Sequence, residues 1–126
     1  MSILVIAVGA SLLLVGDSYT FGKISGPAGP SYAELLEDEL APTVVVNAGI
    51  LASTTGDWLP DGAFYTNRIL PEMPSAVSLL LGTVDALDEP DQERPPIAPE
   101  EYSQNLAAIV DQLILDGAPA VYLSTP

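Results

Sequence analysis

The sequence contains no histidine and no cysteine, and each absence removes a class of chemistry. Without cysteine the chain can form no disulfide, no thiolate nucleophile and no zinc–thiolate site. Without histidine it lacks the usual general base near neutral pH. Carboxylates could still bind a hard cation, but the acidic stretch 88–93 lacks the spacing of a calcium loop and is interpreted as a solvated linker. We therefore expect no metal and no cofactor.

Basic residues are also scarce. Three Lys and Arg stand against 17 Asp and Glu, and the formal net charge is −14. Because phosphate binding needs clustered Lys and Arg, nucleic acid and anionic membranes are not expected as partners. The apolar residues 3–15 form too short a stretch to span a bilayer, and no Lys or Arg precedes Gly16 as a signal peptide would require. A cytoplasmic location is slightly favoured, with secretion as the alternative.

The length and the hydrophobic content of the sequence are sufficient for one folded domain. Of the 126 residues, 48% are hydrophobic, which argues against disorder. Four short apolar runs end at a glycine or a polar residue, as strands buried on both faces do: residues 12–15, 44–47, 76–81 and 120–123. These strands do not account for residues 1–11, which we interpret as a leader or an extra strand.

Helix signals alternate with these runs. Ser31 and Glu34 form a predicted capping box at the start of one helix. Pro99 opens a second helix, and Gly117 is placed to cap its end. A weaker helical pattern covers residues 58–64. Alternating strands and helices predict right-handed crossovers and a parallel sheet within a three-layer α/β/α fold.

Three segments with polar residues and glycines lie at predicted strand ends. They are Gly-Asp-Ser at 16–18, Asn-Ala-Gly at 47–49 and Gly-Thr-Val-Asp at 82–85. In open α/β sheets ligands bind outside the carboxyl ends of the strands, where these segments would meet. Their convergence indicates one functional site, and a serine in the first segment indicates a nucleophile.

These segments, in this order, resemble the motifs of the SGNH (GDSL) hydrolases, and the resemblance covers about the whole chain from residue 12. It implies a flavodoxin-like sheet with strand order 2-1-3-4 and serine esterase activity on small esters. It also implies that Ser18 is the nucleophile and that Gly49 gives a backbone N–H to the oxyanion hole. Val84 stands where the family has an asparagine that adds a further donor.

Two departures from the family pattern shape the expected activity. Val84 carries no donor, and the family's Asp-x-x-His motif, which supplies the base and its orienting acid, is missing. We therefore expect residues 1–126 to be a single incomplete domain, without the family's last strand and helix, that is inactive or nearly so. Its fourth strand would then be an exposed edge that promotes self-association.

Other interpretations stay open at this point. The chain could be a non-catalytic binding module that keeps the fold, or a fragment that needs a complementary segment. Single residues also have structural alternatives. Ser18 could cap a helix that begins at Tyr19, and Asp17 could bond the backbone of the turn. Gly49 and Gly82 could serve turns with positive φ.

Overall fold

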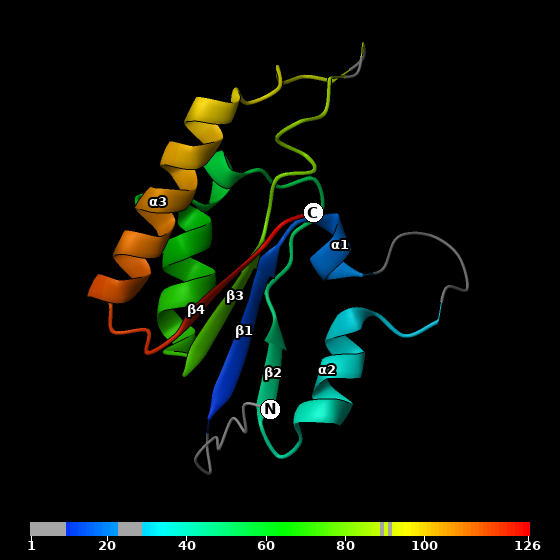
Figure 1. The fold of residues 1–126 in the computed structure, drawn as a ribbon, viewed down its shortest axis with the longest axis vertical. Coiled ribbons are helices and arrows are strands. Elements are labelled where there is room, and N and C mark those ends of the chain that lie inside the picture. Colours follow the sequence, from blue (N-terminus) through cyan, green and yellow to red (C-terminus); the bar gives the residue numbers. More distant parts are fainter. Residues whose placement is uncertain (1–9, 23–28, 89, 91) are drawn as a thin grey trace.

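The computed structural model describes residues 10–22, 29–88, 90 and 92–126, which form an open parallel sheet of four strands flanked by helices (Figure 1). The strands are β1 (Ser11–Gly16), β2 (Val44–Asn47), β3 (Ala76–Leu80) and β4 (Val121–Ser124). They pair in the order β2-β1-β3-β4, which confirms the expected topology. The interpretation of residues 1–11 falls largely outside the described residues, although Ser11 begins β1.

Helices cover both faces of the sheet (Figure 1). On one side lie α1 (Ser18–Phe21) and α2 (Tyr32–Leu40). On the other side lies α3 (Pro99–Leu115), together with the short segments η1 (Thr55–Trp58), η2 (Tyr65–Ile69) and η3 (Leu70–Glu72). The predicted three-layer α/β/α architecture is therefore confirmed. No helix in the described part of the chain has the length and apolar character needed to cross a membrane.

The central strand β1 supplies both cores. Leu13 and Val15 join the larger core between the sheet and α3, whereas Leu14 packs with Ala33 and Val45 beneath α2. The three β1 side chains are fully buried. A strand covered on both faces has no solvent-facing positions, and this is why its sequence is a continuous apolar run rather than an alternation.

The predicted helix signals are present as hydrogen bonds. At the start of α2 the Glu34 N–H donates to Ser31 Oγ (3.3 Å), and the Ser31 N–H donates to Glu34 Oε2 (3.0 Å), which completes the capping box. Pro99 is the first residue of α3. Beyond its end Gly117 has φ 91° and its N–H donates to the Ile114 carbonyl (3.1 Å), as expected of a glycine cap.

The segment after β2 differs from the weak helix expected at residues 58–64. It forms the 3₁₀ turn η1, a tight turn closed by the Gly62 N–H on the Leu59 carbonyl (2.8 Å), and then the π-helical η2. Pro60 and Gly62 explain the interruption, because proline removes a donor and glycine is a weak helix former. Trp58 is nevertheless fully buried, and its Nε1–H donates to Ser53 Oγ (3.0 Å).

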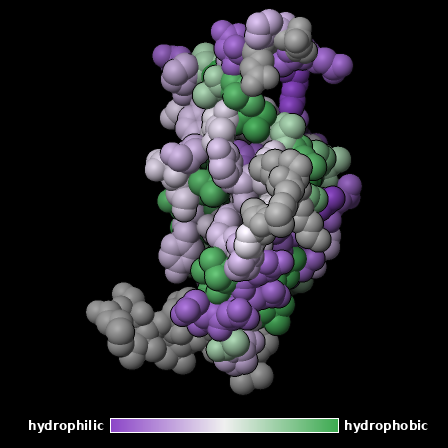
Figure 2. Space-filling model, turned by 90° about the vertical axis from the view of Figure 1, so that its right-hand side faces the viewer, coloured by the Kyte–Doolittle hydropathy of each residue, from purple (hydrophilic) through white to green (hydrophobic). Residues whose placement is uncertain are grey.

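The surfaces formed by α2 and by β4 differ in hydropathy. Hydrophilic side chains gather over α2 in Figure 2, in keeping with its exposed acidic residues Glu37, Asp38 and Glu39. β4 is the last strand of the described sheet, and its Tyr122 and Leu123 are 48% and 58% exposed. The self-association expected at this edge stays a prediction.

Candidate active site

Ser18 lies two residues beyond the end of β1, at the carboxyl edge of the sheet. It is the first residue of α1, and the N-cap is Asp17, whose Oδ1 accepts the Tyr19 N–H (3.0 Å). This confirms the turn-bonding role of Asp17 and replaces the alternative in which Ser18 caps a helix that begins at Tyr19. The half-buried Ser18 side chain is thereby free to face the loop after β2. As a first-turn residue, Ser18 has no intrahelical partner for its own N–H.

The three strand-end segments meet at one edge, as predicted. β1 lies between β2 and β3, with Leu14 opposite Asn47 and Gly16 opposite Leu80. The Ile50 N–H donates to the Gly16 carbonyl (3.0 Å), which continues the pairing into the loop after β2. The fold thus places the Ser18 turn between the other two segments.

Gly49 has a role different from the one that the family resemblance implied. Its N–H donates to Asn47 Oδ1 (2.9 Å), and Asn47 Nδ2–H in turn donates to the Thr20 carbonyl (2.8 Å). A Cβ at Gly49 would lie 2.8 Å from the Thr20 carbonyl carbon and closer still to the Phe21 nitrogen. The φ of Gly49 is not positive, whereas the φ of Gly82 is 138°. Gly49 therefore lets the loop touch the α1 backbone, and its N–H is not directed at Ser18.

The donor that does reach Ser18 belongs to Ala52. Its N–H donates to Ser18 Oγ at 3.0 Å. Ala52 has φ 58°, a left-handed conformation that costs an alanine roughly 1–2 kcal/mol. Sequence reasoning missed Ala52, because positive φ is normally signalled by glycine or asparagine and alanine gives no such signal.

The third segment contributes an anchor rather than a donor. Val84 is half-buried and carries no polar side-chain atom. Asp85 is 3% exposed, and its Oδ1 accepts the Thr55 N–H (3.0 Å) while its Oδ2 accepts the Thr55 hydroxyl. Asn105 Nδ2–H of α3 donates to that same hydroxyl oxygen (3.1 Å). Asp85 and α3 together hold the loop that carries Ala52.

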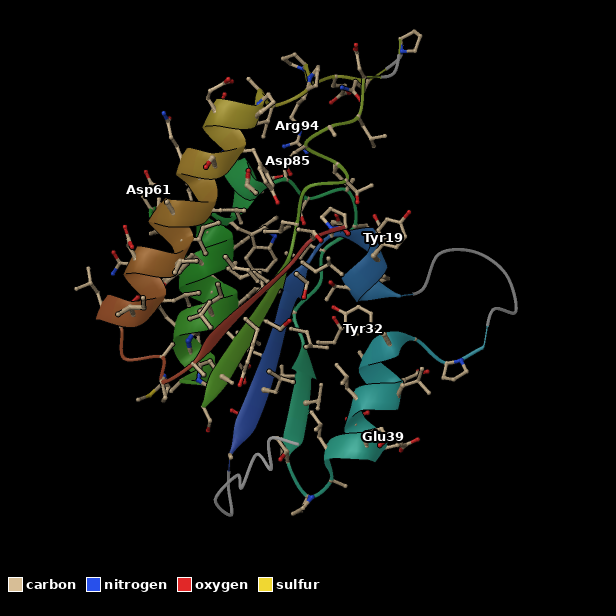
Figure 3. All side chains as sticks on the ribbon, in the orientation of Figure 1. Tyr19, Tyr32, Glu39, Asp61, Asp85 and Arg94 are labelled. Carbon is tan, nitrogen blue, oxygen red and sulfur yellow. The ribbon has the colours of Figure 1, made fainter. Side chains whose placement is uncertain are left out.

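A salt bridge holds the same loop from its outer side. Arg94 Nη1–H donates to both carboxylate oxygens of Asp57 (2.9 and 3.0 Å), and Nη2–H donates to the Ala52 carbonyl (3.0 Å). Arg94 and Asp85 lie at the same end of the sheet as Tyr19, the neighbour of Ser18 (Figure 3). Arg94 was not predicted either, because it directly follows the acidic stretch 88–93 that was interpreted as a solvated linker.

Asp17 is the second buried carboxylate at this edge. Burial raises its pKa, the Tyr19 backbone N–H opposes that shift, and the negative charge of Asp85 adds to it. Its Oδ2 has no hydrogen-bond partner within the part of the chain that the structure describes. Through its bonded oxygen Asp17 shapes the turn that leads into α1.

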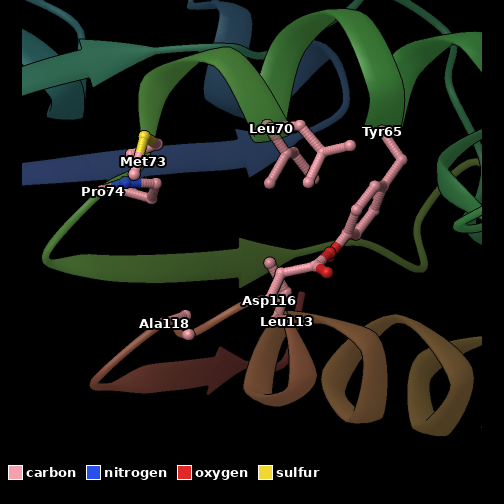
Figure 4. A pocket seen from close by; sticks show the side chains of 9 residues that line it. Tyr65, Leu70, Met73, Pro74, Leu113, Asp116 and Ala118 are labelled. Atoms are coloured by element: carbon pink, nitrogen blue, oxygen red, sulfur yellow. The ribbon is translucent and has the colours of Figure 1, made fainter.

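A separate pocket lies at the opposite end of the sheet. Apolar side chains of η2, η3 and α3 line it, and the Tyr65 hydroxyl donates to Asp116 Oδ2 (2.7 Å) at its side (Figure 4). Burial and this carboxylate raise the pKa of Tyr65. Ligands of open α/β sheets bind at the carboxyl ends of the strands, so this pocket is not part of the Ser18 site. Within the described ranges no cluster of three or more acidic residues could hold a metal ion.

Gly49→Ala tests the close approach of the loop to α1. We expect this variant to lose about 2 kcal/mol of unfolding free energy, because the added methyl group meets backbone atoms that cannot move aside. Gly29→Ala is the control, since a Cβ there meets nothing within 4 Å. Urea unfolding monitored by Trp58 fluorescence measures both variants. Equal midpoints for the two would contradict the role assigned to Gly49.

Comparisons with known proteins agree with the fold of this chain. Residues 14–126 match the model of the GDSL-like Lipase/Acylhydrolase family. An acetylxylan esterase from Geobacillus stearothermophilus has a similar structure (TM-score 0.72, 24% identity, 91% of this chain and 58% of that chain covered). So does an alpha/beta hydrolase enzyme from the metagenome of Lake Arreo, Spain (TM-score 0.74, 24% identity, 91% and 59% covered). No curated protein matches the sequence.

A third similar structure is a protein assigned to the G-D-S-L family of lipolytic proteins from Desulfitobacterium hafniense (TM-score 0.71, 22% identity, 92% and 59% covered). This chain thus spans less than two thirds of the length of the solved structures that it resembles. At these identities the structures establish the fold, and the family model extends from β1 to the last residue of the sequence. The chain belongs to the GDSL-like lipase/acylhydrolase family.

Proposed function

We propose that the protein is a serine hydrolase that acts on small carboxylic esters, with Ser18 as its nucleophile. The observation that carries this proposal is the 3.0 Å hydrogen bond from the Ala52 N–H to Ser18 Oγ at the carboxyl edge of the sheet. A donor that close to the attacking oxygen is also within reach of the oxygen of a carbonyl carbon bonded to it. The membership of the GDSL-like family supports the same reaction class.

In the proposed reaction Ser18 Oγ attacks the ester carbonyl carbon and its proton passes to a base. The carbonyl oxygen becomes an oxyanion, which the Ala52 N–H stabilises together with the N–H of Ser18. The ester C–O bond then breaks, the alcohol leaves with a proton, and water hydrolyses the acyl-serine. Val84 has no donor to add, so the proposed oxyanion hole consists of backbone N–H groups.

The base is the part that residues 1–126 do not supply. The sequence has no histidine, Asp17 caps α1, and Asp85 is buried against Thr55. Among the similar structures are catalytic mutants of the acetylxylan esterase in which alanine replaces a serine, an aspartate or a histidine. We infer that Ser18 corresponds in role to such a serine and that an imidazole base must reach it from outside these residues.

Free imidazole provides the test. The purified chain is incubated with p-nitrophenyl acetate and imidazole, and acetylation of the protein is followed by mass spectrometry of its peptides. Imidazole also converts this ester to N-acetylimidazole, which acetylates exposed hydroxyls without help from the protein. We therefore expect imidazole-dependent acetylation of Ser18 to be faster than that of the exposed Tyr19, because at Ser18 imidazole can take the proton that a histidine would take. Ser18→Ala is the control for acetylation elsewhere. Acetylation that is the same in both proteins would reject Ser18 as the nucleophile.

The second candidate function is a non-catalytic ester-binding module. The specific observation in its favour is Val84, which places an apolar side chain where the related family motif has an asparagine. Such a module would bind a small ester or its analogue without becoming acylated. Binding by the wild-type chain that Ser18→Ala leaves unchanged, with no imidazole-dependent acetylation, is the result expected of this alternative.

A further inference from the structure

The residue that offers the proposed oxyanion donor is held in an unfavourable conformation. Ala52 is exposed and has φ 58°, and among the described residues Met73 is the one other non-glycine residue with positive φ. An exposed alanine in this region relaxes to a more favourable φ unless other contacts fix it. If it relaxed, its N–H would rotate away from Ser18 Oγ. The position of the Ala52 N–H therefore depends on the contacts that hold the N–H and the carbonyl group of this residue.

The backbone of Ala52 has one polar partner on each side. Its N–H donates to Ser18 Oγ, and its carbonyl accepts from Arg94 Nη2–H (3.0 Å). The first bond must be given up when the oxyanion forms and takes the N–H. The second bond is independent of the reaction, so it can hold the residue throughout.

The Arg94 guanidinium is itself fixed by a second part of the same loop. Asp57 accepts Nη1–H with both oxygens, and its Oδ2 also accepts the Thr54 N–H (2.9 Å) at the start of η1. One planar group therefore bridges residues 52 and 57. A lysine could carry the charge, but a single ammonium lacks the fork that donates to a carboxylate and a carbonyl in fixed directions.

The solvent exposure of the Arg94–Asp57 salt bridge indicates that it positions the loop more than it stabilises the fold. The Arg94 side chain is 55% exposed and that of Asp57 is 29% exposed. Ion pairs at such sites contribute little to unfolding free energy. Arg94 is also one of only three Lys and Arg in the sequence, and it extends to this loop from a stretch whose Ile97 N–H is anchored on the Asp85 carbonyl (2.8 Å).

We propose that Arg94 is a positioning residue that holds the Ala52 N–H toward Ser18 by bridging Asp57 and the Ala52 carbonyl. The proposal rests on the proposed function, in which this N–H receives the oxyanion. Arg94 touches neither substrate nor the reacting atoms in this scheme. Its effect reaches the reaction through the conformation of a single residue.

The test compares Arg94→Gln and Arg94→Lys with the wild-type chain. Arg68→Gln is the matched control, because it removes the same charge from η2 outside this loop. Two readouts are used: the ¹H and ¹⁵N chemical shifts of the Ala52 amide, and the rate of imidazole-dependent acetylation of Ser18. Thermal unfolding shows that each variant is folded.

Both Arg94 variants are expected to shift the Ala52 amide resonance and to slow Ser18 acetylation by about tenfold to a hundredfold, while remaining folded. Arg68→Gln should leave the resonance and the rate unchanged. An Ala52 amide that does not move in folded Arg94→Gln overturns the positioning role, whatever the rate. If the wild-type chain shows no Ser18 acetylation but the amide depends on Arg94, the positioning role stands and the proposed function fails.

Discussion

Without added imidazole, the purified 126-residue chain is expected to release p-nitrophenol from p-nitrophenyl acetate no faster than its Ser18→Ala variant. The sequence has no histidine, so no Ser–His pair can form within one chain or between identical copies. In a comparable triad the loss of the base lowers kcat on the order of a millionfold. A further oxyanion donor at residue 84 would contribute about 2.7–4 kcal/mol of transition-state stabilisation, and Val84 has no polar side-chain atom to provide it.

A spectrophotometric assay of both proteins at equal concentration decides this prediction. Because acidic surface groups and the buffer hydrolyse activated esters slowly, only the difference between wild type and Ser18→Ala is informative. A robust rate that disappears in Ser18→Ala would show that another group in these residues activates the serine. The carboxyl group of Asp17 would then be the first candidate to replace, since it is adjacent in sequence.

The second large effect is expected from Asp85→Ala. This change leaves the buried N–H and hydroxyl of Thr55 without their acceptor, and hydrogen bonds to charged groups contribute about 1.5–3 kcal/mol each. Removal of the charge also relieves repulsion with Asp17, which offsets part of the loss. We expect a net decrease of about 3 kcal/mol in unfolding free energy, because two donors lose their partner and one repulsion is relieved.

Asp88→Ala is the control for Asp85→Ala, because it removes an equal charge from an exposed position three residues along the chain. A surface change of this kind alters stability by about 0.5 kcal/mol or less. Urea unfolding can be followed through Trp58, the single tryptophan, which bonds Ser53 in the same loop. Equal midpoints for the two variants would show that the Asp85–Thr55 contact does not hold this loop.

The parts of the fold that local patterns determine could be predicted from the sequence. The runs at 12–15 and 44–47 became strands because their side chains are apolar enough to be covered, and Ser31 with Glu34 formed the predicted capping box. The weak pattern at 58–64 did not give a regular helix, since Pro60 and Gly62 interrupt it. These outcomes depend on neighbours within a few residues, and sequence patterns report such neighbours well.

The parts that were missed depend on residues far apart in sequence. Ala52 meets Ser18 and Arg94, which are 34 and 42 positions away. No local pattern marks an alanine for positive φ, and Arg94 directly follows the stretch 88–93, whose composition indicates a solvated linker. The assignment of Gly49 followed a motif, whereas its N–H has the side chain of Asn47 as a partner two residues away.

The anchoring of the loop after β2 has a consequence for protein engineering. That loop is fastened at Thr55 by Asp85 and Asn105 and at Ala52 by Arg94, so its shape is encoded by residues 82–105 as much as by its own sequence. A graft of residues 48–58 alone onto another parallel sheet would carry the sequence of the donor loop without its fastenings. To transplant the Ser18 site, or to recombine it with a related domain, the crossover points should keep residues 48–58 and 82–105 from the same parent.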